Sequence, residues 1–343
     1  SEDLFHLIQS LSKSEKRSFK LSASTDSKEK QYITIFDLIA RQKKYDEEAI
    51  IKKLKIPNSA FAVYKNHLYR LLLQKVSVQH SGKEAELRTL LTQADFLYSK
   101  GLYPLYEKML KRVKKLASHY DMDNILLEVI NMEYRNAWRK RDLQKATMFM
   151  EEGKEILKRF NNFRQYTHLN YEIVRSLLSF DKRKTQEVNK LKTLMQNPLI
   201  RDDKNAITFR SKYSLYHTLS LYYSVQDNLE KQHHFAKKAT ELYETHPEKI
   251  KHDTFNYLLS LHLMLSACHS LKRFDEAKKY IDKLRIDTSL LTNVREKIWV
   301  FFTFHDANLN HFIKTGRFAE GEPSAEILIN ELNEYSSKLE TSQ

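Results

Sequence analysis

The residues best suited to chemistry in this chain are histidines and one cysteine. His233 and His234 are adjacent, so on a helix they would point about 100° apart and could not hold one ion together. His262 and His269 are seven residues apart and would share a helix face, but only Cys268 lies near them in the sequence. The chain also has no His-Glu-x-x-His motif and no glycine-rich phosphate loop. We therefore expect no metal site, no cofactor and no enzymatic activity, and we interpret Cys268 as an apolar core residue.

The elements that carry these residues should be helices. Five Gly and five Pro in 343 residues fall well below the usual shares of roughly 7% and 5%. Hairpin turns and bulges are therefore scarce. Large apolar residues recur at three- and four-residue spacing, as in Tyr213, Tyr216 and Leu219, which is the period of a helix face. The sequence predicts an all-α fold with aromatic residues between the helices.

Positive charge is concentrated in the middle of the chain. Residues 51–200 contain 29 Lys or Arg against 15 Asp or Glu, a surplus of 14 that equals the net charge of the whole chain. Such a surplus attracts acidic protein segments or nucleic acid through long-range steering. A solvated lysine-rich surface has the same composition, so the charge by itself leaves these interpretations open.

The cysteine count and the hydropathy pattern bear on location. One cysteine cannot form an internal disulfide, and no signal-peptide pattern is visible. The longest apolar run, residues 298–304, is far shorter than the roughly 18 residues of a membrane span. We expect a cytoplasmic protein without membrane contact.

The first 80 residues form a separate helical region in this interpretation. Helices are expected at residues 2–10, 14–21, 29–42, 47–54 and 60–78, with Asp46 and Ser59 as caps of the last two. Residues 22–28 should form a loop. The last two helices have helix-turn-helix dimensions.

A nucleic-acid contact is one interpretation of this helix pair. If the second helix packs through Phe61, Leu68, Leu71 and Leu72, four polar side chains face outward and could contact phosphates and base edges, namely Lys65, Asn66, Tyr69 and Arg70. An amino-terminal cap on a helical array has the same pattern, and the sequence leaves both alternatives open.

A turn-then-helix pattern recurs after residue 83. The clearest copy is Leu271–Ile281, and Arg139–Ala146 resembles it closely. Six positions match at intervals of 40 to 45 residues: Tyr106, Ala146, Glu187, Gln232, Ala277 and Gly321. The third copy has a charged residue where alanine is expected, and Gly321 and Pro323 should interrupt the last helix. This spacing predicts about six helix pairs over residues 84–343.

The chain thereby resembles the tetratricopeptide-repeat superfamily, most closely uncharacterised bacterial tetratricopeptide-like proteins. The resemblance covers residues 84–343, and the interval exceeds the standard repeat of about 34 residues. It implies a right-handed α-solenoid of stacked antiparallel helix pairs, with residues 1–80 as an N-terminal helical cap. The oligomeric state stays open.

In that superfamily the first helix of each pair lines a concave groove that binds peptides or helices. The resemblance places nine residues on this groove: Asn131, Arg135, Trp138, Arg139, His217, His262, His269, Asp306 and Asn310. Guanidinium and indole groups suit an acidic peptide. We expect a non-catalytic protein-interaction scaffold with a basic concave groove. The alternative is a nucleic-acid-binding transcriptional regulator with a helix-turn-helix and a repeat sensor domain.

Overall fold

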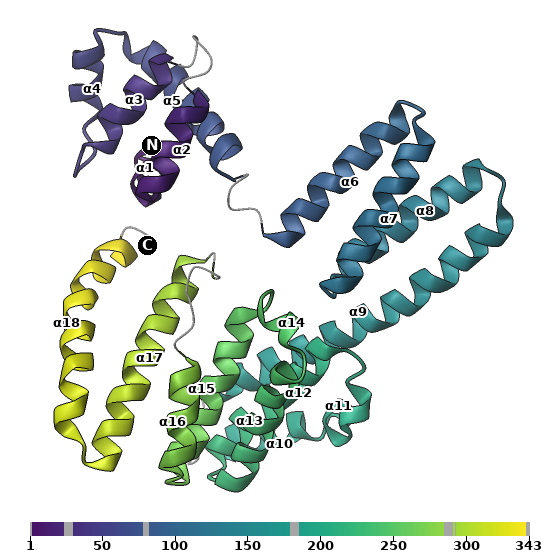
Figure 1. Ribbon diagram of the computed structural model, residues 1–343, viewed down its shortest axis with the longest axis vertical. Helices are drawn as coiled ribbons and strands as arrows, with labels where there is room; N and C mark the ends of the chain where they lie inside the picture. The colour runs from purple at the N-terminus through teal and green to yellow at the C-terminus, as the bar shows by residue number, and fades with distance from the viewer. Residues whose placement is uncertain are drawn as a thin grey trace. The chain divides into compact units, whose positions relative to one another are not determined.

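The protein is helical throughout the part of the chain that the structure describes. The computed structural model describes residues 2–23, 30–77, 82–178, 185–284, 291 and 293–340. Every regular element in these ranges is a helix, as the composition predicted. None of these helices is both long enough and apolar enough to cross a membrane. The chain divides into two compact units, residues 1–83 with 331–343 and residues 84–330 (Figure 1).

The N-terminal unit contains five helices around one apolar core. They are α1 (Asp3–Ser10), α2 (Lys13–Ala23), α3 (Lys30–Ala40), α4 (Glu47–Leu54) and α5 (Asn58–Ser77). The four residues predicted to anchor α5 are buried, namely Phe61, Leu68, Leu71 and Leu72. Part of the loop predicted at residues 22–28 lies outside the described residues, and Ser22 and Ala23 belong to α2.

Two helix caps were predicted in this unit, and one of them is observed. The Asp46 carboxylate accepts a hydrogen bond from the Ala49 N–H at 2.9 Å, so Asp46 caps α4. Helix α5 begins at Asn58, one residue before the predicted cap Ser59. The Phe61 N–H donates to the Pro57 carbonyl at 3.1 Å, which starts the helical hydrogen bonding before Ser59.

The second unit is a succession of helices packed in adjacent pairs (Figure 1). Its long helices are α6 (Lys83–Ser99), α7 (Tyr103–His119), α8 (Asp123–Arg139), α9 (Leu143–Leu178), α10 (Thr185–Met195), α12 (Phe209–Val225), α13 (Leu229–Glu244), α15 (Thr254–Ser270), α16 (Phe274–Lys283), α17 (Val294–Thr315) and, as far as Asn330, α18 (Phe318–Glu340). Short helices α11 (Pro198–Arg201), η3 (Asp203–Asn205) and α14 (Pro247–Ile250) lie in the connections.

One turn geometry recurs between the long helices. A residue with left-handed backbone, φ between 52° and 72°, follows six of them: Gly101, Asp121, Arg141, Asp227, Lys272 and Gly316. The N–H of the next residue then donates to a carbonyl five residues back, as from Arg273 to Cys268 at 2.9 Å and from Asp142 to Ala137 at 3.0 Å. This hydrogen bond satisfies a carbonyl at the helix end and turns the chain sharply into the next helix.

The repeat pattern is interrupted at α9. This helix runs unbroken for 36 residues, and it covers both the expected second helix of the second pair and the expected first helix of the third pair. Between Lys154 and Asn170 there is neither Gly nor Pro to end it. Ile156 packs in the core of α6–α8, whereas Tyr166 packs in the core of α12–α17. Helix α9 therefore joins two apolar clusters.

The last helix also differs from the sequence interpretation. Gly321 and Pro323 do not interrupt α18, which continues from Phe318 to Glu340 with Pro323 inside it. Proline removes one backbone donor near the beginning of the helix and keeps a helical φ. A Cβ on Gly321 would lie 3.2 Å from the Phe312 Cβ. Glycine thus allows α18 to approach α17 closely.

Two lysine-to-glycine substitutions, one at a turn and one inside a helix, test whether the left-handed turn residue is strained. A left-handed backbone costs a residue with a side chain about 1 kcal/mol, and glycine avoids this cost. We expect Lys272→Gly to raise the free energy of unfolding by roughly 0.5 to 1 kcal/mol. The exposed Lys279 lies inside α16, and Lys279→Gly should lower the free energy of unfolding by about 1 kcal/mol. Urea denaturation of both variants measures the difference. Equal effects of the two substitutions would contradict the strained turn.

Candidate binding groove on the first helices

Four of the predicted groove residues lie on α8, and all four are exposed: Asn131, Arg135, Trp138 and Arg139. The first three follow one another at helical spacing and so share one face. The opposite face of the same helix carries Ile125 and Val129, both fully buried. Trp138 has 53% of its surface exposed. An indole exposed to this extent offers a large apolar contact area to a ligand.

The two arginines of this face are positioned by neighbouring helices. The Arg135 guanidinium lies 3.5 Å from the Asp95 carboxylate of α6, and both side chains are exposed, so this pair adds little stability. The Arg139 guanidinium lies 3.4 Å from the centre of the Tyr103 ring at the start of α7. It also donates to the Asn136 side-chain oxygen at 3.0 and 3.2 Å. Arg139 is thus held at the end of α8.

The stacking of Arg139 on Tyr103 places the α8–α9 turn beside the α6–α7 turn. Leu102 precedes Tyr103 at the α6–α7 turn, and Leu143 opens α9 just after the α8–α9 turn. Both leucines are exposed. Lys100 and Arg141 are exposed cations of the same two turns. The α8 face therefore ends in a surface that combines apolar and positively charged groups.

His217 is not a free groove residue. It lies on α12, and its Nδ1 is 3.1 Å from the side-chain amide nitrogen of Asn170 on α9. Burial lowers the pKa of His217 to about 4, so the imidazole is neutral near pH 7. His217 belongs to the packing between α9 and α12. The register placed it on the correct helix, but the neighbouring helix covers it.

The predicted residues of α15 and α17 lie together around one cleft. Its lining includes His262, His269, Asp306 and Asn310, and its volume is about 210 Å³. Ser266, Ser270 and Lys314 also line it. The sequence register assigned the four predicted residues to two different helix pairs, and the contact between α15 and α17 brings them together.

His269 is the most buried polar group of this cleft. It is 9% exposed, and its Nε2 has no hydrogen-bond partner among the described residues. Its ring stacks on His311 of α17 with 5.7 Å between centroids. Burial, with smaller contributions from Lys314 and His311, lowers the pKa of His269 to about 4. The unpaired Nε2 is itself buried, so it faces the protein interior rather than the open part of the cleft.

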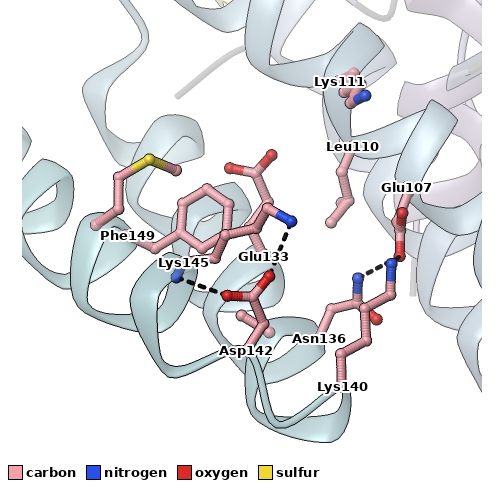
Figure 2. Close-up of a pocket in the computed structure, with 11 residues that line it drawn as sticks. Glu107, Leu110, Lys111, Glu133, Asn136, Lys140, Asp142, Lys145 and Phe149 are labelled. Atoms are coloured by element: carbon pink, nitrogen blue, oxygen red, sulfur yellow. Dashed lines mark hydrogen bonds and ion pairs between the residues drawn. The ribbon is translucent and has the colours of Figure 1, made fainter.

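A second cleft, of about 220 Å³, lies among α7, α8 and α9 and was not predicted from the sequence. Figure 2 shows Glu107, Asn136 and Lys140 on one side of it, with Lys145 and Phe149 on the other. Asn136 donates to Glu107 at 2.6 Å, and Lys140 pairs with the same carboxylate. These contacts lower the pKa of Glu107, the Lys140 hydrogen bond most of all.

The charges of this second cleft largely neutralise one another. Lys145 pairs with Asp142 at 2.8 Å, and Lys114 bridges Glu133 and Glu152 at 2.8 and 2.7 Å. Burial raises the pKa of Glu133 despite the nearby ammonium group. Helical spacing of the polar residues in α8 could have indicated this cleft. Because its carboxylates already have cationic partners, we regard it as packing between helix pairs.

The four residues considered for nucleic-acid contact are not equivalent. Asn66, Tyr69 and Arg70 are exposed on α5, as expected. Lys65 does not face outward, because its ammonium group lies 2.6 Å from the Glu47 carboxylate of α4. It also lies 5.4 Å from the centre of the Phe61 ring. Lys65 therefore connects α4 to α5, and the Lys65 hydrogen bond lowers the pKa of Glu47.

The buried histidines predict an acid-sensitive second unit. The pKa of His269 is about 4 in the folded chain and 6.5 in the unfolded chain, so the unfolded chain binds more protons in this range. Stability should be complete above about pH 6.5 and fall towards pH 4, by roughly 2 to 3 kcal/mol from His269. Urea denaturation across this range measures the loss. His269→Phe should reduce it, whereas His234→Ala, at an exposed position, should not. An equal loss in both variants would contradict the assignment.

Comparison with known proteins adds no further assignment. No family model, curated protein or solved structure matches the chain. The resemblance to tetratricopeptide repeats rests on the residues quoted above, and the function must be argued from the geometry of the helices and their exposed faces.

Proposed function

We propose that the chain is a non-catalytic protein-interaction scaffold, built as a right-handed tetratricopeptide-like solenoid with residues 1–80 as its cap. It binds an acidic peptide or helix on the first helices of its pairs. The recurrence of one turn geometry after six helices supports a repeated architecture. Stacked helix pairs present extended surfaces rather than a single deep pocket, which suits a peptide or a helix as ligand.

The observation that carries this proposal is the exposed face of α8. Trp138 offers apolar area, and Arg135 lies one helical turn before it on the same face. Exposed Trp and Arg are the residue types that dominate binding energy at protein interfaces. Guanidinium groups bind carboxylates through two parallel hydrogen bonds. An acidic peptide with an apolar anchor side chain matches this combination.

The α15–α17 cleft offers a second contact for the same class of ligand. Lys314 supplies a cation there, and Asp306 supplies an anion. The Asn310 amide adds a neutral hydrogen-bonding group. This set suits the amides of a peptide backbone better than a second cluster of carboxylates. Acidic side chains are therefore assigned to the α8 face.

Trp138 makes the proposal directly measurable. The chain has two tryptophans, so Trp299→Phe leaves Trp138 as the single indole reporter. Peptides selected from a randomised acidic library against the purified chain should shift the emission of Trp138. Arg135→Glu with Arg139→Glu should weaken their binding at least about tenfold, because each interface arginine contributes about 1 kcal/mol or more. Fluorescence titration gives the affinities.

The matched control is a charge reversal away from α8. Lys279 is exposed on α16, and Lys279→Glu changes the net charge without touching the proposed surface. Peptide affinity should remain within about twofold in this variant once salt screens long-range attraction. Equal affinity of the selected peptides for the Arg135/Arg139 variant and the unchanged chain would remove the α8 face from the proposal.

A second candidate function has its own observation. Helices α4 and α5 are joined by the three residues 55–57, and Asn66, Tyr69 and Arg70 are exposed on α5. This arrangement has the dimensions of a helix-turn-helix whose second helix reads a duplex. A transcriptional regulator of this kind would use the repeats to sense a ligand or a partner. The engagement of Lys65 with Glu47 removes one expected phosphate contact, so this candidate ranks second.

Two charge-matched variants, compared at two salt concentrations, distinguish DNA contact through α5 from non-specific electrostatic attraction. If α5 contacts DNA, Arg70→Ala should weaken binding by about 1 to 3 kcal/mol, because a phosphate or base contact is lost. Arg41→Ala outside α5 is the control, since it removes the same charge from an exposed position at the end of α3. Fluorescence anisotropy with duplex DNA at two salt concentrations measures both. Equal losses in the two variants would leave only the general positive charge as the source of affinity.

A further inference from the structure

Three potential metal ligands from three helices converge in the second unit. They are His233 on α13, Cys268 on α15 and Glu276 on α16, and one donor atom from each lies within 4.8 Å of the other two. Cys268 is fully buried, and His233 is 8% exposed. The Glu276 side chain is about one-third exposed. The cluster is therefore closed on the sulfur side and accessible from the carboxylate side.

The distances in this cluster are close to those of a metal site. His233 Nε2 lies 3.2 Å from each carboxylate oxygen of Glu276. In a tetrahedral zinc site with bonds of about 2.0 to 2.1 Å, nitrogen and oxygen ligands are separated by about 3.3 Å. The sulfur would have to approach by about 1 Å at most to complete the set. We propose that His233, Cys268 and Glu276 bind Zn²⁺.

The ligand types select the metal. A thiolate and an imidazole favour zinc over magnesium or calcium, which prefer oxygen ligands alone. Three protein ligands leave the fourth tetrahedral position for water, supplied from the exposed side of Glu276. On binding, the Cys268 thiol releases its proton to solvent as the sulfur–zinc bond forms. The imidazole proton of His233 moves from Nε2 to Nδ1, and the hydrogen bond between His233 and Glu276 is replaced by one bond from each residue to the metal.

Arg273 lies beside the cluster without blocking it. Its Nη1 is 3.4 Å from Nδ1 and 3.3 Å from Nε2 of His233. Nearly equal distances place this nitrogen over the imidazole ring rather than in line with the Nε2 lone pair. The other terminal nitrogen bonds both oxygens of Glu230 at 3.0 Å. A thiolate and a carboxylate balance Zn²⁺, and Arg273 is balanced by Glu230.

Metal binding would connect neighbouring helix pairs. Helix α13 belongs to the pair α12–α13, whereas Cys268 and Glu276 belong to the pair α15–α16. A shared ion would hold these pairs together in the folded chain and would be released on unfolding. Metal binding of this kind adds directly to the free energy of unfolding.

Cobalt(II) substitution tests the site in the full chain. Co²⁺ in a zinc site gives visible absorption bands of tetrahedral intensity and a thiolate-to-cobalt charge-transfer band in the near ultraviolet. The chain, freed of metal by a chelator, should bind one equivalent and show both signals, and Zn²⁺ should displace the cobalt. Cys268→Ser should lose the charge-transfer band. His233→Ala should weaken zinc binding at least about 100-fold, since even groups behind the ligands contribute 10- to 100-fold.

The adjacent histidine supplies the matched control. His234 is exposed on the same helix, so His234→Ala should leave the metal affinity and the cobalt spectrum unchanged. If Cys268→Ser does not fold, Glu276→Gln tests the same site through its most exposed ligand and should also weaken zinc binding. The proposal is wrong if the unchanged chain binds neither ion, if His234→Ala abolishes binding, or if His233→Ala binds as tightly as the unchanged chain.

Discussion

The second unit depends on a hydrogen bond that crosses the ends of six of its helices. After six helices a left-handed residue lets the following N–H reach a carbonyl five residues back, as from Arg317 to Phe312 at 2.9 Å. This bond ends one helix and directs the chain back along it. An amphipathic helix cannot bury its apolar face alone, so the returning helix covers it. Neighbouring helix pairs then bury the apolar surface that a single pair would leave exposed to solvent.

The same turns position the residues that carry chemistry. The carbonyls that accept the crossing bond belong to helix-end residues such as Ala137 and Cys268, both buried. Trp138, one residue beyond Ala137, points to solvent. The turn after α15 likewise brings α16, with Glu276, back beside Cys268. A peptide surface and a metal-ligand cluster can therefore both arise from the geometry of helix ends, without any loop devoted to a site.

Local sequence signals predicted most of the helices. They failed where contacts with residues far away in the sequence determine the structure. Asp46 was recognised as a cap because a carboxylate before an apolar run bonds a free N–H of the first turn. Helical spacing identified Phe61 and Leu68 as core residues. The continuous α9 was missed because the expected break followed the repeat register, and the continuous α18 was missed because Gly321 and Pro323 were expected to end a helix. Helical spacing placed Lys65 on the surface, and its partner Glu47, 18 residues away, could not be identified from that spacing.

The sequence by itself determined the helical class, the apolar faces and the helices that carry the candidate residues, because these depend on composition and on a period of a few residues. Tertiary structure decided which side chains meet. It covered His217 with α9 and gathered His262, His269, Asp306 and Asn310 around one cleft. It also placed His233 beside Cys268, which lies 35 residues later in the chain. These contacts between side chains of different helices depend on the angles between stacked helices, and no short stretch of sequence encodes those angles.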